Sequence, residues 1–559
     1  MNMEHIYKEH YKRKTQSLNG NWSFCTDPLN KGKAEKWFDG FPLNSTYINV
    51  PSCWNFEKGL FDYFGVAWYK KEFYCNDCFL QIDFGAVSGF AEVYLDGEYL
   101  GKHYGGWLEF KLFKKVSSGK HSLVVSVDAS SNNLNTIPLQ EVDWYHYGGI
   151  TRSVEITEFT DPFIDFYKIS YNLNQQLSGA DLSIELGMNC LEQPQCDLHL
   201  SIYINNASVY SETRSFCSGE IIRLKNITLR DIRLWNVGAP YLYDVRIETD
   251  FDDVREKIGF RKIKAEKNKI YFNNKELYLK GINRHEEHPD WGFAVPANIQ
   301  KRDVDIIKDM GCNIVRGSHY PNSHTFLDYL DREGILFWSE IPMWGFPPSA
   351  LADPITKERG FAMHNEMIDQ YYHHPCIVMW GLHNEIASDS NEGYELTRCF
   401  SEFVRNKDSS RLTVYATCRY NKDMCLEFTD VIALNYYMGW YSGNFNDWDE
   451  FFDNIPKIAK AHNVAEKPVV MSEFGCAAIF GNSNFSEDKW TMQYQSQMLE
   501  KVIGLSKERG ISGTFVWQFA DVKSDININR ARSFNNKGIL DEYRRPKFSY
   551  YTVKKEYSF

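Results

Sequence analysis

The chain has 559 residues, which at about 100–200 residues per domain predicts three domains, or at most four, and argues against one compact unit. Apolar residues make up 43% and charged residues 24%, which is ordinary for a globular protein and too apolar for disorder. The net charge of −12 has the wrong sign for a protein that binds the phosphate backbone of nucleic acids. Aromatic residues reach 16%, and such rings suit amphipathic ligands such as sugars.

The N-terminus and the cysteines bear on where the protein works. No apolar run reaches the roughly 18 residues of a membrane span, and residues 1–14 are polar and lack a hydrophobic signal core. We therefore expect a cytoplasmic protein with no membrane contact. Cys75 and Cys78 have the spacing of half a zinc site but no second pair follows, so we expect reduced thiols.

Residues 1–160 show one short strand after another. Residues 79–84, 91–95 and 122–127 alternate or are rich in β-branched side chains, and Asp96-Gly97 is a strong hairpin signal. No helical stretch interrupts them for long. This pattern predicts a β-sandwich of jelly-roll size.

Residues 161–262 form a second strand-rich unit. Its clearest runs, at 180–186, 197–203 and 243–248, alternate with period two. About 100 residues of this pattern fit an immunoglobulin-like sandwich, although the Cys-Trp-Cys signature of antibody domains is missing.

From residue 263 to residue 559 the pattern changes to strands that alternate with amphipathic helical stretches, such as 301–310, 325–333 and 493–508. Eight apolar runs recur about every 34 residues, which is the spacing expected of a (β/α)₈ barrel. The runs lie at residues 277–282, 313–316, 335–338, 377–382, 412–415, 431–434, 468–471 and 513–517.

Two glutamates follow barrel strands and are candidates for catalysis. Glu385 comes after the fourth run and Glu473 after the seventh. Catalytic groups of such barrels lie at the C-terminal ends of the strands, so both carboxylates are expected on the same rim. A pair of carboxylates that flanks one bond is what hydrolysis of a glycoside requires. Either glutamate alone would be unremarkable, but the pair predicts a glycosidase.

Several motifs in this order resemble glycoside hydrolase family 2, and the resemblance covers nearly the whole chain. It implies a jelly roll, an immunoglobulin-like sandwich and a catalytic TIM barrel, in that order. The motifs are Leu-Asn-Gly-Asn-Trp-Ser-Phe at 18–24, Gly-Ile-Asn-Arg-His-Glu at 281–286, Val-Arg-Gly-Ser-His-Tyr-Pro at 315–321, Asn384-Glu385, and Ser-Glu-Phe-Gly at 472–475.

The resemblance also implies roles for individual residues in a retaining double displacement. Glu385 would be the general acid/base, kept protonated by burial or by nearby negative charge. Glu473 would be the nucleophile, kept ionised by hydrogen-bond donors, one of them Tyr437. Asn384 would bind the sugar 2-hydroxyl. Arg316 and His319 would complete the polar floor of the sugar site, and Trp517 would offer a ring face to the sugar.

The identity of the sugar depends on residues after the eighth strand. Asn535 and Lys537 resemble the Asn-x-Lys element with which β-glucuronidases of this family hold a C6 carboxylate, and an ammonium with an amide gives charge-assisted hydrogen bonds to such a group. Asn435 and Tyr441 match residues used around that carboxylate. Asp143 resembles the aspartate that the jelly roll sends to the sugar hydroxyls.

We therefore expect an exo-acting enzyme that removes terminal β-D-glucuronic acid from small-molecule or glycan glucuronides. A β-galacturonidase or β-galactosidase stays open, because Arg530 and Arg532 each lie one residue away from the position of the family's arginine. A sugar-binding protein without activity is a further alternative, disfavoured by the presence of both glutamates. We expect Lys537 on an exposed rim loop.

No cofactor and no metal are expected, and a homo-oligomer, either a dimer or a tetramer, is expected from the family's sandwich domains. His285 and His288 are three residues apart instead of the four of a helical zinc motif, and they follow a strand. The chemistry proposed needs no metal.

Overall fold

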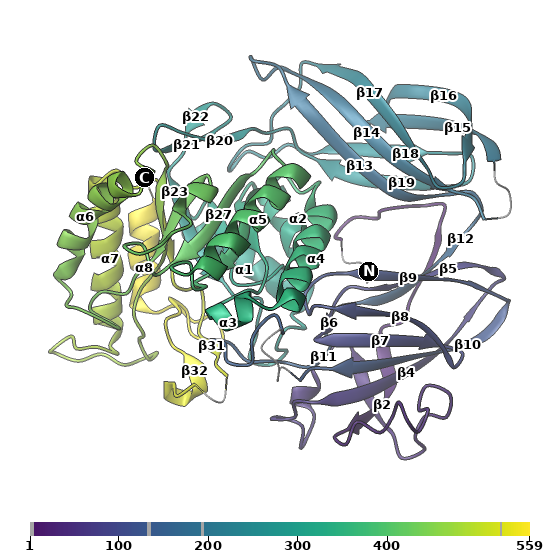
Figure 1. The fold of residues 1–559 in the computed structure, drawn as a ribbon, viewed down its shortest axis with the longest axis horizontal. Helices are drawn as coiled ribbons and strands as arrows, with labels where there is room; N and C mark the ends of the chain where they lie inside the picture. Colours follow the sequence, from purple (N-terminus) through teal and green to yellow (C-terminus); the bar gives the residue numbers. More distant parts are fainter. Residues whose placement is uncertain (1–4, 131–135, 192–194, 526–527, 559) are drawn as a thin grey trace.

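A computed structural model describes residues 5–130, 136–191, 195–525 and 528–558. Figure 1 shows a barrel with two β-sandwiches at its side, the first in purple and blue and the second in teal. The three parts follow one another along the chain in the predicted order. Within the described ranges, no helix is long and apolar enough to cross a lipid bilayer.

The first sandwich packs a four-stranded sheet on a six-stranded sheet, as predicted for a jelly roll. Side chains that alternate along the strands fill the space between the sheets, and the residues of this core are almost fully buried. The smaller sheet contains β1 (Lys14–Ser17), β12 (Val154–Phe159), β5 (Cys78–Phe84) and β9 (Phe110–Val116). The larger contains β3 (Thr46–Val50), β2 (Gly20–Asp27), β4 (Val66–Cys75), β10 (Gly119–Asp128), β7 (Phe90–Leu95) and β8 (Glu98–Tyr104).

The second sandwich packs a three-stranded sheet on a four-stranded sheet, which matches the immunoglobulin-like expectation. Its core is formed by aliphatic side chains at alternate positions. The strands are β13 (Phe163–Leu173), β14 (Gly179–Asn189) and β17 (Glu220–Arg230) in one sheet, and β16 (Ala207–Cys217), β15 (Gln195–Ile204), β18 (Tyr243–Glu248) and β19 (Asp253–Ile258) in the other.

The eight runs predicted as barrel strands are the eight strands of a closed parallel barrel. Because helices cover its outside and side chains fill its inside, the strands are buried on both faces and are mostly apolar, with polar residues concentrated towards their C-terminal ends. The strands are β23 (Leu279–Arg284), β24 (Ile314–Gly317), β25 (Leu336–Glu340), β26 (Ile377–Asn384), β27 (Leu412–Thr417), β28 (Val431–Asn435), β29 (Val469–Phe474) and β30 (Gly513–Val516).

Eight helices are described around the barrel, and α2 shows how capping residues set the ends of a helix. In α2 the Ser323 side chain accepts a hydrogen bond from the Phe326 amide, and Gly334 ends the helix in the left-handed region at φ 69°. The helices are α1 (Ala297–Asp309), α2 (His324–Glu333), α3 (Pro348–Leu351), α4 (Pro354–Tyr371), α5 (Asn391–Lys407), α6 (Asp447–Ala461), α7 (Met492–Glu508) and α8 (Phe548–Tyr557).

Polar contacts fasten the jelly roll to the mouth of the barrel. The Arg152 guanidinium donates to Glu286 Oε1 at 3.2 Å, and the Tyr147 hydroxyl donates to Glu287 Oε1 at 2.9 Å. All four side chains are buried. A jelly-roll segment, residues 141–148, therefore lies against the barrel rim, where its side chains can contribute to a site on that rim.

Candidate active site

Glu385 and Glu473 both lie on the C-terminal rim of the barrel, as predicted. Glu473 belongs to β29, in register with Asn435 of the neighbouring strand β28. Glu385 follows the last residue of β26 and has φ 51°, in the left-handed region that a residue with a side chain seldom adopts. Such a conformation costs about 1–3 kcal/mol, so the surrounding structure must hold it in place.

Both oxygens of Glu473 accept hydrogen bonds. The Arg316 guanidinium donates to Oε1 at 2.8 Å, and the Tyr437 hydroxyl donates to Oε2 at 2.7 Å. His319 Nε2 lies 3.9 Å from Oε1. The orientation of the carboxylate is therefore fixed from two sides, with Tyr437 in the contact predicted for it.

Arg316 links this carboxylate to Glu340, a residue that the sequence analysis did not single out. The guanidinium donates to both Glu340 oxygens, at 3.0 and 2.9 Å, and both side chains are fully buried. Burial alone would lower the pKa of Arg316, but Glu340 and Glu473 raise it. Burial also lowers the pKa of His319 to about 3, helped by the charge of Arg316, so the imidazole is neutral. Arg316 is a permanent cation beneath the site.

The surroundings of Glu385 favour the protonated form of its carboxyl group. Burial is the main cause that raises its pKa to about 7, and the negative charge of Glu473 acts in the same direction. A hydrogen bond from Asn435 Nδ2 to Glu385 Oε1, at 2.8 Å, and the nearby Arg419 counteract part of this rise. The two carboxyl groups therefore have different surroundings, which is the arrangement that acid/base catalysis needs.

Asn384 has its acceptor satisfied and its donor free. Its Oδ1 accepts from Arg316 Nη2 at 2.7 Å and from Asn435 Nδ2 at 3.2 Å. Its Nδ2 is buried and has no hydrogen-bond partner among the residues that the structure describes. An unpaired buried donor is costly, and this amide is left with a hydrogen bond that it does not make within the protein. We call Arg316, Asn384, Glu385, Asn435, Tyr437 and Glu473 the glutamate cluster.

A second group of polar residues includes Lys537, and here one expectation was wrong. Lys537 is not exposed on a rim loop but is only 1% exposed. Two hydrogen bonds hold the segment around Lys537 against the barrel mouth. Gln518 N donates to the Lys537 carbonyl oxygen at 3.0 Å, and the Gly538 amide donates to the Asp521 side chain, at Oδ1, at 2.9 Å. The ammonium donates to Asn535 Oδ1 at 3.1 Å and lies 4.9 Å from the centre of the Tyr441 ring.

Asp143 reaches this group from the jelly roll. Its carboxylate accepts two hydrogen bonds from Arg530, at 2.7 and 2.5 Å, and one from Asn535 Nδ2 at 2.8 Å. Arg530 Nη1 also lies 3.2 Å from the Tyr441 hydroxyl. We call Asp143, Tyr441, Arg530, Asn535 and Lys537 the lysine cluster. Arg530 supplies a second cation although its position in the sequence is one residue away from the family's arginine.

Asn435 was expected around the C6 carboxylate and Trp517 as a ring face, and the structure gives both residues other contacts. Asn435 contacts Glu385 and Asn384, and its Oδ1 accepts from Ser472 Oγ at 2.7 Å, so it belongs to the glutamate cluster. Trp517 is 3% exposed, and its ring stacks on the His319 ring with centroids 5.1 Å apart.

The histidines considered for a metal have other partners. His285 Nδ1 lies 3.2 Å from the Tyr320 hydroxyl, and His288 Nδ1 contacts the Asp290 amide at 3.2 Å. Another pair, His324 and His374, lies with ring nitrogens 2.9 Å apart. That distance fits a hydrogen bond between the two rings.

Comparison with known proteins agrees with this arrangement. Three family models match: "Glycosyl hydrolases family 2, sugar binding domain" over residues 15–160, "Glycosyl hydrolases family 2" over 163–261, and "Glycosyl hydrolases family 2, TIM barrel domain" over 263–559. A β-glucuronidase of Paenibacillus borealis is 25% identical, over 97% of this chain and 96% of its own length.

Solved structures extend the similarity to three dimensions. A β-galacturonidase from Eisenbergiella tayi, bound to galacturonate, is 30% identical with a TM-score of 0.91, and the match covers 99% of each chain. A β-glucuronidase from an uncultured Clostridium species is 25% identical with a TM-score of 0.89, again over 99% of each chain.

Proposed function

The chain belongs to glycosyl hydrolase family 2, and we propose that it removes a terminal β-linked hexuronic acid by a retaining double displacement. D-glucuronic acid is the first candidate for that sugar. The observation that supports a uronic acid is the lysine cluster. Lys537 and Arg530 place two cations beside Tyr441, whereas a neutral hexose would leave the buried ammonium without an anionic partner. A C6 carboxylate would supply that partner.

The glutamate cluster supports the chemistry. The Glu473 carboxylate would attack the anomeric carbon while Glu385 gives its proton to the glycosidic oxygen, so that the aglycone leaves and an ester forms. Glu385 would then take a proton from water, which attacks the same carbon and releases Glu473. Two inversions give retention. Tyr437 and Arg316 would hold the nucleophile in place, and Asn384 would donate to the 2-hydroxyl.

A β-galacturonidase is the second candidate, and the Eisenbergiella tayi structure favours it. The two sugars differ only in the configuration at C4. Both carry the carboxylate that the lysine cluster would bind, so this cluster does not by itself separate them. Asp143 could contact a sugar hydroxyl, but it is also held by Arg530 and Asn535.

A panel of p-nitrophenyl β-glycosides tests the proposal. We expect the glucuronide or the galacturonide to be hydrolysed with the highest kcat/KM, and proton NMR of the first product to show the β anomer. The ratio between the two uronides decides between the candidates. Preference for the galactoside, or no hydrolysis of either uronide, would refute the uronidase proposal.

A further inference from the structure

Three histidines meet outside the candidate active site, at the boundary between the N-terminal arm and the barrel. His5 belongs to this arm, residues 5–13, which precedes β1. His324 is the first residue of α2, and His374 lies between α4 and β26. One ring nitrogen of each lies within 4.8 Å of a ring nitrogen of the other two. Side chains that are far apart in the sequence and can each bind a metal therefore lie together.

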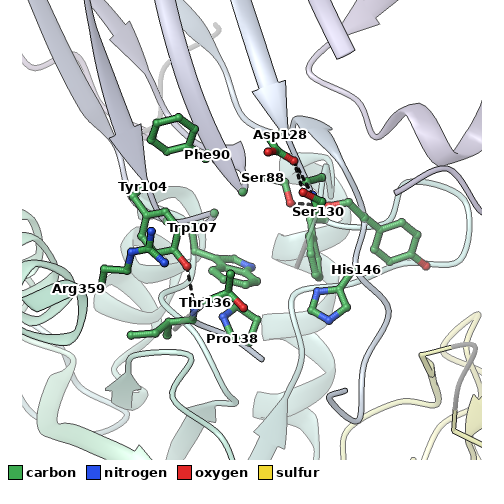
Figure 2. A pocket seen from close by; sticks show the side chains of 17 residues that line it. Ser88, Phe90, Tyr104, Trp107, Asp128, Ser130, Thr136, Pro138, His146 and Arg359 are labelled. Atoms are coloured by element: carbon green, nitrogen blue, oxygen red, sulfur yellow. Dashed lines mark hydrogen bonds between the residues drawn. The ribbon is translucent and has the colours of Figure 1, made fainter. Parts of the chain in front are cut away.

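The cavity shown in Figure 2 offers no comparable group among its described lining residues. It lies where the jelly roll meets the barrel, and His146 is the one histidine and Asp128 the one carboxylate of that described lining. A metal ion needs several ligand atoms at once. The three histidines are therefore the stronger candidate for a further site.

The spacing of the three rings suits a shared ion. His324 Nδ1 lies 2.9 Å from His374 Nε2, and the centre of the His5 ring lies 4.3 Å from that of His324 and 5.7 Å from that of His374. With Zn–N bonds of about 2.0–2.1 Å, two nitrogens on one ion lie about 3.0–3.4 Å apart. The contact between His324 and His374 is close to this value, and His5 can approach because its arm is neither strand nor helix.

Carboxylates hold the other sides of two of these rings. Asp328 accepts from His5 Nδ1 at 3.0 Å, and Asp331 accepts from His374 Nδ1 at 2.6 Å. Histidines that bind metals usually donate their second nitrogen to a carboxylate, which fixes the tautomer and leaves the lone pair of the first nitrogen free. A third carboxylate oxygen, Glu9 Oε1, lies 4.0 Å from His5 Nε2. The negative charge of these groups favours a cation among the rings.

Helix α2 buries three polar side chains on the face that carries His324. Positions 324, 328 and 331 lie on one side of a helix because they are separated by four and three residues. His324, Asp328 and Asp331 are 6%, 4% and 3% exposed. Burial of polar groups costs free energy unless they find partners, and a bound cation would offset part of that cost.

We propose that this histidine cluster, His5, His324 and His374 with Asp328 and Asp331 behind them, binds one divalent transition-metal ion, with zinc as the first candidate. Imidazole nitrogens suit zinc, copper and nickel, whereas calcium and magnesium prefer oxygen ligands. The three imidazoles would be the ligands, and the two aspartates would orient them.

The ion would have a structural role. Tyr7 of the arm already donates to Glu256 of the second sandwich, and the Tyr11 amide donates to Asp253 at 2.8 Å. A metal on His5 would fix the start of the same arm to α2, so that the arm joins the second sandwich to the barrel. No residue of the glutamate or lysine cluster takes part, so the proposal goes beyond the hydrolytic activity and does not depend on it. It departs from the expectation of no metal, which considered the spacing of other histidines and the needs of the hydrolysis.

Titration of the chelator-treated full chain with Zn²⁺, in competition with a chromophoric chelator, tests the site. We expect saturable binding of one ion per chain. His5→Gln removes a ligand, and its Kd should rise more than about 100-fold, whereas Asp328→Asn keeps the size and removes the charge, and its Kd should rise about 10–100-fold. Zn²⁺ should raise the unfolding temperature of wild type and leave that of His5→Gln unchanged, because only a state that binds the ion is stabilised by it.

The matched control is His10→Gln, which changes another histidine of the same arm outside the cluster. His10 Nδ1 is buried and has no hydrogen-bond partner in the described part of the chain. The Kd of His10→Gln for Zn²⁺ should equal that of wild type. If His5→Gln fails to fold, His324→Gln takes its place, with the same loss expected. The proposal is overturned if the chain does not bind Zn²⁺ saturably, if the ligand variant binds it as tightly as wild type, or if crystals grown with Zn²⁺ show no anomalous peak among the three rings.

Discussion

The glutamate cluster and the lysine cluster lie on the same barrel rim but are assembled differently. Every member of the glutamate cluster is on a barrel strand or within two residues after one, and Arg316 joins Asn384 to Glu473 through hydrogen bonds. The lysine cluster combines Asp143 of the jelly roll with Tyr441 and with the segment that folds back after β30. The barrel thus positions the proposed chemistry, and contacts between domains position the proposed sugar recognition.

The largest effect is expected from Glu473→Gln, which removes the nucleophile and leaves the lysine cluster intact. We expect kcat to fall on the order of 10⁴-fold or more. Steady-state kinetics with an aryl uronide measures this loss, and thermal unfolding checks that the variant folds. Activity within tenfold of wild type would show that Glu473 does not form the covalent intermediate.

Lys537→Met tests the other cluster at similar side-chain volume, which matters because Lys537 is buried. A hydrogen bond to a charged group contributes about 1.5–3 kcal/mol, so kcat/KM for the uronide should fall about 10–150-fold. Any activity on a neutral β-galactoside should stay unchanged or rise. An equal loss on both substrates would mean that Lys537 supports the fold and does not select the sugar.

Asp143→Asn weakens the link between the domains. The carboxylate orients Arg530 through two hydrogen bonds, so its loss should lower kcat/KM for the uronide by about tenfold, mainly through KM. As a control, Asp128→Asn changes a jelly-roll aspartate that lies outside both clusters, and uronide kinetics should be unaffected. Equal kinetics of Asp143→Asn and wild type would remove the jelly roll from sugar recognition.

The smallest effect concerns the pH profile. Glu385 must be protonated to act as an acid, and its pKa is raised to about 7, so kcat/KM should fall as pH rises above about 7. Arg419 lowers this pKa, so Arg419→Met should move the basic limb to higher pH by less than about one unit. A limb that moves to lower pH would contradict this assignment.

The sequence predicted the glutamate cluster better than the lysine cluster. Glu385 and Glu473 could be placed because parallel strands end at one rim, and a short apolar run locates each strand. Glu340 lies at such an end too, but one glutamate without a motif gave no signal. The burial of Lys537 and the reach of Arg530 depend on how a long loop folds back, which has no periodicity from which its path can be predicted.

Trapping the intermediate tests the central claim most directly, because the trap forms only if the sugar is recognised and the nucleophile attacks. A 2-deoxy-2-fluoro-β-hexuronosyl fluoride should inactivate the protein and add one fluorohexuronosyl group to the peptide that contains Glu473, as read by mass spectrometry. The neutral hexosyl analogue should label far more slowly. Faster labelling by the neutral reagent, or a label on any residue other than Glu473, would contradict the account.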